Sequence, residues 1–171
     1  PDQSNLNAQM PNPGNRQQLA PAGDNKLPVV YGTAYLGGIV TDLTISEDNQ
    51  DIYWVISLCE VTNTESGGTP DNITFGNIYY GGKKVIFDST YQYKVTGLLD
   101  ESTGALDTQV NGKIEIYLYS NGSNSPYNSS QSAISVMQAS GLQYQWDNTK
   151  LMSNCAFAIV HLTYNQEANV T

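Results

Sequence analysis

Ile52-Tyr53-Trp54-Val55-Ile56-Ser57-Leu58-Cys59 is the stretch of sequence that decides the fold, because an extended chain with these residues is apolar on both faces. A strand without a polar face must be covered on both sides, so it lies inside a sheet. A second run of this kind is Cys155-Ala156-Phe157-Ala158-Ile159-Val160-His161-Leu162-Thr163-Tyr164. The two runs predict two central strands of a β domain.

Shorter strands are expected around these two. Two β-rich runs meet at Gly81-Gly82, which predicts a hairpin between residues 73–80 and 83–88. Alternation of apolar and polar residues predicts further strands at 41–45, 91–95 and 113–119. Residues 97–112 are expected to be a variable connection that contains Asp100-Glu101-Ser102-Thr103-Gly104.

One segment has helical spacing. Ala133, Ile134 and Met137 fall on one helical face, with Ser129 or Ser130 as N-cap and Gly141 as the stop. We therefore expect a mainly β fold, a compact barrel or sandwich of about eight strands, with one short helix at about 130–140.

The stretch Leu27-Pro28-Val29-Val30-Tyr31-Gly32-Thr33-Ala34-Tyr35-Leu36-Gly37-Gly38-Ile39-Val40 mixes strand-forming residues with three glycines. Proline suits the first residue of a strand, and glycine permits a bulge or a turn. The pattern predicts a kinked hairpin of two short strands.

Residues 1–26 hold four prolines among Asn, Gln and Gly and have no apolar period. They are expected to form an extended arm or linker that lies on a neighbour or is ordered in an assembly. Residues 27–171 are expected to be a single β-rich domain. The absence of an initial Met favours a fragment of a larger protein.

Charge limits the partners. The chain has 7 Lys and Arg against 16 Asp and Glu, a net charge of −9, which repels phosphate backbones and anionic membranes. No apolar run approaches the roughly 20 residues that span a bilayer. Nucleic acid and a membrane anchor are therefore not expected.

Catalytic residue patterns are not found, and the prediction is that the chain is not an enzyme and binds no cofactor. His161 is the single histidine and is expected to be structural. Glu47, Asp48 and Asp51 lack the ordered spacing of a calcium loop, so a solvated acidic turn is favoured. Glu60 and Glu115 lie on predicted strands with nothing to indicate proximity, so no acid and base pair is assigned.

Cys59 and Cys155 each lie in an apolar strand-like run, where buried thiols are common. Buried thiols are favoured over a disulfide, which stays open as the alternative.

Twelve tyrosines and two tryptophans are the compositional bias with a functional meaning. Aromatic rings stack on sugars, and tyrosine is also enriched in subunit interfaces and in sheet packing. Packing or an interface is favoured over a ligand. The residues concerned include Tyr79, Tyr80, Tyr91, Tyr93, Tyr117, Tyr119, Tyr127 and Tyr144.

Residues 27–33 with Gly37-Gly38-Ile39-Val40 resemble the Pro-Val-Val-Tyr-Gly and Val-Gly-Gly signature of the tail tip proteins of long-tailed bacteriophages, also called central tail hub, host-specificity or tip attachment proteins. Leu58-Cys59-Glu60 is similar to the end of the strand that follows in the family. The element Asn77-Ile78-Tyr79-Tyr80-Gly81-Gly82-Lys83-Lys84-Val85, the strand 112–119, the helix 130–141, Trp146 and the strand 156–164 are similar in order and spacing. The resemblance spans about residues 16–165.

One departure concerns Ala34, Tyr35 and Leu36, which stand where the family usually carries basic residues. The resemblance implies a virion structural role in a ring at the distal end of the tail, generally a homotrimer. Such a ring joins the tail tube to receptor-binding parts and is made in the bacterial cytoplasm. Its expected partners are other tail tip subunits, and indirectly a host receptor or glycan.

Seven residues are candidates for an interface or a ligand site: Tyr31, Tyr35, Gly37, Gly38, Tyr79, Tyr80 and Trp146. The alternative function is a carbohydrate-binding domain of a tail fibre or adhesin, which predicts a shallow groove with exposed Tyr or Trp rings near Asp or Asn. A glycan-degrading enzyme is a third class, and the low charge of the strands disfavours it.

Overall fold

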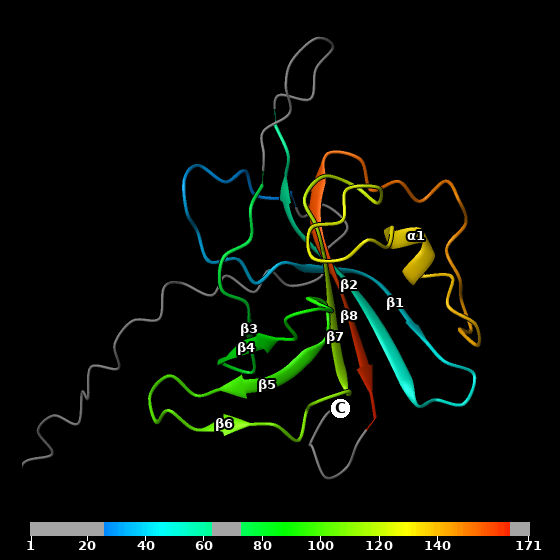
Figure 1. The fold of residues 1–171 in the computed structure, drawn as a ribbon. Helices are drawn as coiled ribbons and strands as arrows, with labels where there is room; N and C mark the ends of the chain where they lie inside the picture. Colours follow the sequence, from blue (N-terminus) through cyan, green and yellow to red (C-terminus); the bar gives the residue numbers. More distant parts are fainter. Residues whose placement is uncertain (1–25, 63–72, 165–171) are drawn as a thin grey trace, which may run out of the picture.

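The structure, a computed structural model, describes residues 26–62 and 73–164 (Figure 1). The described strands form two antiparallel four-stranded sheets, which confirms the mainly β prediction with about eight strands and one short helix. The first sheet has the order β1-β2-β8-β7 and the second has the order β3-β4-β5-β6. The elements are β1 (Ile39–Ile45), β2 (Asp51–Glu60), β3 (Tyr79–Tyr80), β4 (Lys83–Phe87), β5 (Val95–Leu99), β6 (Leu106–Asp107), β7 (Ile114–Tyr119), α1 (Ala133–Val136) and β8 (Cys155–Thr163).

The two runs that are apolar on both faces are the central strands of the first sheet, as predicted. β2 pairs with β1 and β8, and β8 pairs with β2 and β7. Alternate residues of each strand point to opposite faces, so both strands supply side chains to two separate cores. Tyr53 and Phe157 belong to the first core, whereas Trp54 and Val160 belong to the second.

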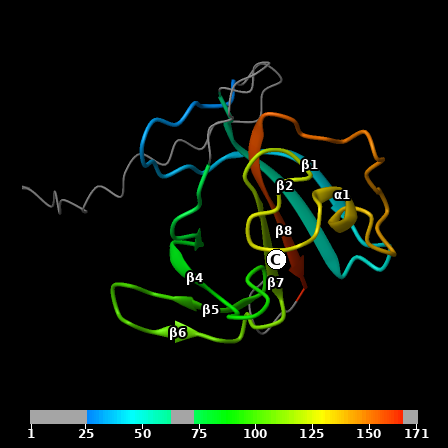
Figure 2. The same cartoon turned by 45° about the horizontal axis from the view of Figure 1, so that its top comes forward.

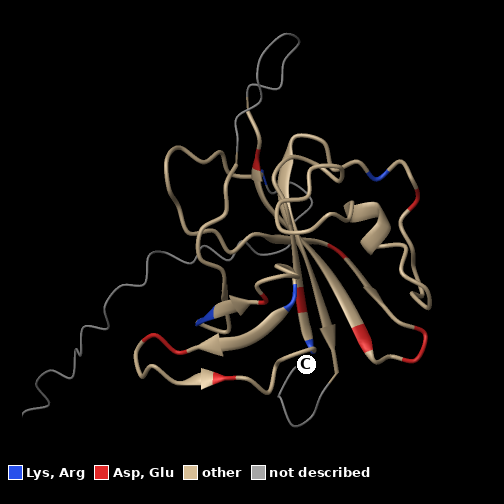
Figure 3. Cartoon of the chain, in the orientation of Figure 1, with Lys and Arg blue, Asp and Glu red and all other residues tan. Residues whose placement is uncertain are grey.

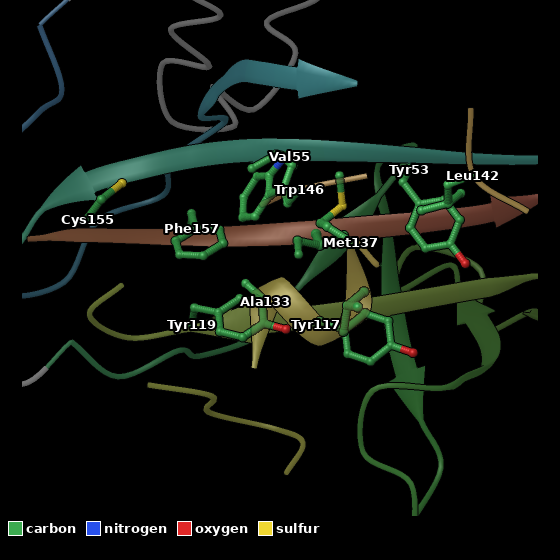
Figure 4. Packing of buried hydrophobic residues seen from close by; sticks show 12 residues of the cluster. Tyr53, Val55, Tyr117, Tyr119, Ala133, Met137, Leu142, Trp146, Cys155 and Phe157 are labelled. Atoms are coloured by element: carbon green, nitrogen blue, oxygen red, sulfur yellow. The ribbon is translucent and has the colours of Figure 1, made fainter. Parts of the chain in front are cut away.

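The first core lies between the first sheet and the chain segment 120–152, which carries α1 (Figures 1 and 4). Tyr119 and Phe157 stack here with ring centroids 4.7 Å apart. Ala133 and Met137 place the helix on these rings and are fully buried. Burial of several large side chains at about 1.5–3 kcal/mol each holds this irregular segment on the sheet.

The second core lies between the two sheets, and the sheets are joined at one edge. Tyr93 and Lys94 pair with β7 before the chain continues into β5: Lys94 forms a bridge with Glu115, and the Ile116 N–H donates to the Tyr93 carbonyl at 2.7 Å. In Figures 1 and 2, β4, β5 and β6 lie on the β7 side of the molecule and away from β1. The second sheet therefore covers the β7 and β8 half of the first sheet.

Glycine makes the turn between β3 and β4, as the sequence predicts. Gly81 and Gly82 both have positive φ, +56° and +83°, which is the requirement of a tight two-residue hairpin. The paired part is shorter than expected, because β3 is limited to two residues.

The prediction of a hairpin over residues 27–40 is wrong. The stretch is irregular up to Gly38, and one bridge, between Val29 and Glu60, is its connection to a strand. β1 starts at Ile39, and Gly38 has φ +69°. Beyond this single bridge the stretch runs without regular pairing to a strand, so its local strand propensity is overridden.

Residues 97–112 also differ from the prediction, since they contain most of β5 and all of β6. The polar run is a compact turn: Asp100 Oδ1 accepts the N–H groups of Ser102 and Thr103, and Gly104 has φ +74°. Side-chain bonds of this type close tight turns, so the polar sequence joins two strands instead of replacing them. The predicted strand at 91–95 is likewise shifted, because β5 begins at Val95.

α1 is shorter than the predicted helix, and its N-cap is Ser132. Ser132 Oγ accepts the Ser135 N–H at 3.2 Å. The Met137 carbonyl accepts the Trp146 N–H at 3.1 Å, because the chain turns back over the sheet directly after α1. Tertiary contacts therefore end the helix before Gly141.

Cys59 and Cys155 are buried and free, and burial raises the pKa of each thiol. The predicted arm, except for Lys26, lies outside the described residues, as do 63–72 and 165–171.

Gly38→Ala is expected to lower the free energy of unfolding by about 2 kcal/mol or more, from a strained backbone and from overpacking. A Cβ on Gly38 would overlap Ile56 Cγ2 and lie 2.8 Å from the Ser57 carbonyl oxygen. The matched control is Gly76→Ala, where a Cβ would meet open space, with an expected change within about 0.5 kcal/mol. Urea denaturation of both variants measures the effect, and equal losses would contradict it.

Candidate functional site

The opening stretch places two of the predicted candidates in solvent. Tyr31 is 90% exposed and Tyr35 is 75% exposed, although both are large aromatic side chains. Val29 and Leu36 of the same stretch are each 39% exposed. We name residues 29–36 the exposed segment.

Both ends of the exposed segment are fixed to β2. At its start, the Glu60 N–H donates to the Pro28 carbonyl at 2.9 Å. At its end, Gly38 lies against Ile56 and Leu58, which leaves no room for a side chain. Gly37 precedes this contact and is exposed. The segment is therefore a loop with anchored ends that presents apolar side chains outward.

Tyr79 and Tyr80 lie on β3 and have different surroundings. Tyr79 meets Tyr35 edge to face, with ring centroids 6.2 Å apart, and its hydroxyl donates to Glu101 Oε2 at 3.0 Å. This hydrogen bond to Glu101 raises the pKa of Tyr79. Tyr80 packs half-buried against the second core, and burial raises its pKa. The structure therefore brings together Tyr35 and Tyr79 among the candidates.

Trp146 is not part of this surface, which corrects its selection as an interface candidate. Its side chain is 2% exposed in the first core, where Nε1–H donates to Asp42 Oδ2 at 2.7 Å (Figure 4). Lys150 lies 3.9 Å from the same carboxylate. The polar sequence around Trp146 predicts an exposed loop, but this loop folds over the sheet and buries the indole.

An ionic cluster around His161 is the feature that sequence reasoning missed. His161 lies on β8, directly opposite Tyr53 of β2 and Glu115 of β7 in the strand register. Its Nε2 is 2.8 Å from Asp51 Oδ1, and its Nδ1 is 3.1 Å from Glu115 Oε2. Tyr53 stacks on the imidazole with centroids 4.2 Å apart. The three strands bring together residues that lie far apart in sequence.

Further hydrogen bonds complete the cluster. The Tyr117 hydroxyl donates to Glu115 Oε2 at 2.7 Å, and Thr163 Oγ1 donates to Asp51 Oδ1 at 2.7 Å. Burial alone lowers the pKa of His161, but the hydrogen bonds and charges of Glu115 and Asp51 outweigh it, so the pKa lies above its ordinary value. Burial likewise raises the pKa of Glu115, and the bonds from His161 and Tyr117 bring it below its ordinary value. The pair is therefore stable as imidazolium and carboxylate.

This arrangement supports a structural role for His161, as the sequence predicts. Both ring nitrogens of His161 are engaged by carboxylates, and burial raises the pKa of Tyr53 stacked on the ring to about 12. In residues 26–62 and 73–164, no group of three or more His, Cys, Asp or Glu side chains is placed to hold a metal ion.

The acidic candidates are separated. Glu60 is paired with Cys155 at the end of β8 opposite to His161 and Glu115, which places Glu60 and Glu115 roughly 20 Å apart along the strands. Asp48 accepts the Gln50 N–H at 3.0 Å within its own turn, and Asp51 binds His161. The acidic turn thus has internal bonds instead of a shared cation site.

A shallow groove of about 360 Å³ lies where the second sheet meets the loop after β7. Phe75 and Tyr127 form its apolar wall, with ring centroids 4.9 Å apart at 64°. Asn128 lines it too, but its side chain accepts from the Leu118 N–H and donates to the Ile116 and Gln92 carbonyls. Much of the polar lining therefore serves the fold.

Comparisons with models of protein families, with curated proteins and with solved structures find no match. None of the helices in the described part of the chain has the length and apolar character needed to cross a membrane.

The stability of the protein is expected to fall as the pH rises from the ordinary histidine pKa of about 6.5 through the raised pKa of His161, because His161 loses its proton. With a raised folded-state pKa, the stabilisation is complete below the ordinary value of 6.5 and is lost as the pH passes the raised value. Urea unfolding at a series of pH values measures the slope. In His161→Gln this part of the slope should vanish, and an unchanged slope in the variant would contradict the assignment.

Proposed function

We propose that this chain is a structural module of the distal tail hub of a long-tailed bacteriophage, which contacts other subunits of the tail tip. The observation that carries the proposal is the exposed segment, whose two ends are fixed to β2. Between these ends, Tyr31 and Tyr35 are exposed to solvent. Transfer of the apolar surface of a large aromatic side chain from water into an interface is favourable, so an interface would stabilise these exposed rings.

The sequence resemblance supports the same proposal. Four segments carry the resemblance, and they follow one another in the structure in the same order. They are the glycine-rich stretch that ends at Gly38, the strand β2 with Leu58-Cys59-Glu60 at its end, the β3–β4 turn with Gly81-Gly82, and the final strand β8. Part of the stretch with the signature residues packs against the fold, since Val30 contacts a buried cluster and Gly38 lies against β2. Tyr31 is 90% exposed and has no such packing role, so a contact with another subunit is the better account of this side chain.

The anchoring of the exposed segment favours tight docking. Its ends are fixed before binding, so less conformational entropy is lost when the loop meets a partner. Tyrosine is prominent among residues that contribute most to interface energies. Tyr31 and Tyr35 are therefore the proposed anchors, with Tyr79 supporting Tyr35 from β3.

The combined variant Tyr31→Ala and Tyr35→Ala is expected to abolish incorporation of the protein into tail particles. Both side chains are exposed, so the free energy of unfolding of the isolated chain should change by less than about 0.5 kcal/mol. Incorporation is measured by complementing a phage that lacks the protein and by purifying its tails.

The matched control is Tyr144→Ala, which removes an exposed tyrosine (49%) from the loop over the first core. Normal tails from the control and none from the double variant support the proposal. Normal tails that fail to adsorb to the host would instead favour receptor recognition.

Carbohydrate binding is the second candidate, and the groove beside Phe75 and Tyr127 favours it. Tyr127 is 44% exposed and an aromatic ring of this kind stacks on sugars. If the groove binds glycans, a neutral oligosaccharide titrated into the isolated chain should shift the NMR signals of Tyr127 and Gln92, and Tyr127→Ala should abolish the shift. No response to a panel of neutral glycans would exclude this candidate at millimolar affinity.

A further inference from the structure

One face of the first sheet is only half covered. The open face consists of Val40, Leu43 and Ile45 on β1 and Ile56, Trp54 and Ile52 on β2. These residues are direct cross-strand pairs: Val40 with Ile56, Leu43 with Trp54 and Ile45 with Ile52. All six are apolar and share one side of the sheet.

Exposure increases across this side from β7 to β1. Ile116 of β7 is 3% exposed and Val160 of β8 is 7% exposed, because the second sheet covers them. The β2 residues are half-buried, and on β1 Val40 reaches 48% and Leu43 reaches 49%. Figures 1 and 2 show β4, β5 and β6 away from β1. Among residues 26–62 and 73–164, no strand or helix covers the open face, which continues the apolar side that forms the second core.

The edge of β1 is blocked, so a partner is expected to dock on the face and not to add a strand. The Leu43 N–H is bound by Asp42 Oδ1 at 2.8 Å, and the Ile45 carbonyl accepts the Gln143 N–H at 2.9 Å. A bulge interrupts the register between Val40 and Asp42. These are the devices by which edge strands avoid pairing.

Trp54 lies in the middle of the open face. Its indole Nε1–H is buried without a hydrogen-bond acceptor in the described part of the chain. A buried donor without an acceptor is unfavourable, and a carbonyl from a docked chain would supply one after a small rotation of the side chain.

Charge identifies the kind of partner. Glu47 and Asp48 are exposed in the turn between β1 and β2, at one end of the open face (Figure 3). A second copy of this chain does not fit well, because its net charge is also −9. Three of its lysines, Lys83, Lys84 and Lys150, are already within ion-pair distance of acidic side chains.

We propose that the open face docks a different protein surface, with an apolar centre that covers Leu43 and Trp54 and with Lys or Arg residues that meet Glu47 and Asp48. Hydrophobic burial supplies the affinity, and the acidic turn sets the orientation and selects against copies of the chain itself. This inference is separate from the exposed segment and does not depend on the proposed place in a phage tail.

The test uses a short amphipathic peptide of Leu and Lys, together with a twin in which Glu replaces Lys. In NMR titrations of the labelled chain, the Lys peptide should shift the amides of 40–45 and 52–56 and the Trp54 indole signal. Leu43→Asp should weaken binding about tenfold or more, since it removes a leucine that the bound peptide buries and introduces a charge. The matched control is Leu106→Asp, which changes an exposed leucine (52%) on β6 and should leave the affinity unchanged.

Several outcomes would overturn the proposal: no binding of the Lys peptide, equal binding of the Glu twin, shifts confined to other surfaces, or equal weakening by Leu106→Asp. Sedimentation that shows a wild-type dimer broken by Leu43→Asp would assign the face to a second copy. Thermal unfolding verifies that Leu43→Asp is folded. If Leu43→Asp is not folded, Val40→Asp replaces it, because Val40 lies on the same strand and is equally exposed. The same loss of affinity is expected for Val40→Asp.

Discussion

The pairing of β2 with β8 is the interaction on which the rest of the structure depends. These two strands are flanked by others on both edges and supply side chains to the cores on both faces. Residues Tyr53 and Phe157 hold the irregular segment with α1, whereas Val160 holds the second sheet. Separation of this pair would expose both cores together, so neither layer is expected to be stable without it.

Polar side chains complete this apolar framework where regular pairing ends. His161 joins Asp51 and Glu115 across three strands, and the Asn128 side chain satisfies β7 backbone groups that lack a strand partner. Ser46 Oγ similarly accepts the Gln50 and Asp51 N–H groups in the turn before β2. Buried polar groups need partners, so these bonds fix the ends of the strands as the apolar residues fix their middles.

The framework leaves apolar side chains outside its cores, and two groups of them carry the proposals. The exposed segment presents tyrosines from anchored ends, and the open face extends the apolar side of the sheet beyond the cover of the second sheet. Other exposed apolar side chains, such as Tyr91 and Leu106, lie apart from these two features, which are the proposed contact sites. A module with two contact sites of different chemistry suits an assembly in which each neighbour is distinct, which agrees with the proposed tail hub.

The sequence alone determined the central strands, the glycine turn and the mainly β class, because residues 52–59 and 155–164 require cover on both faces and Gly81-Gly82 requires positive φ. Tertiary structure decided the rest. The opening stretch has strand propensity, but it forms a single bridge to β2 before β1 begins. Trp146 lies in a polar stretch of sequence and is buried because that loop folds over the sheet. In the His161 cluster, His161 and Asp51 lie 110 positions apart in the sequence. Only the strand register brings these charges together.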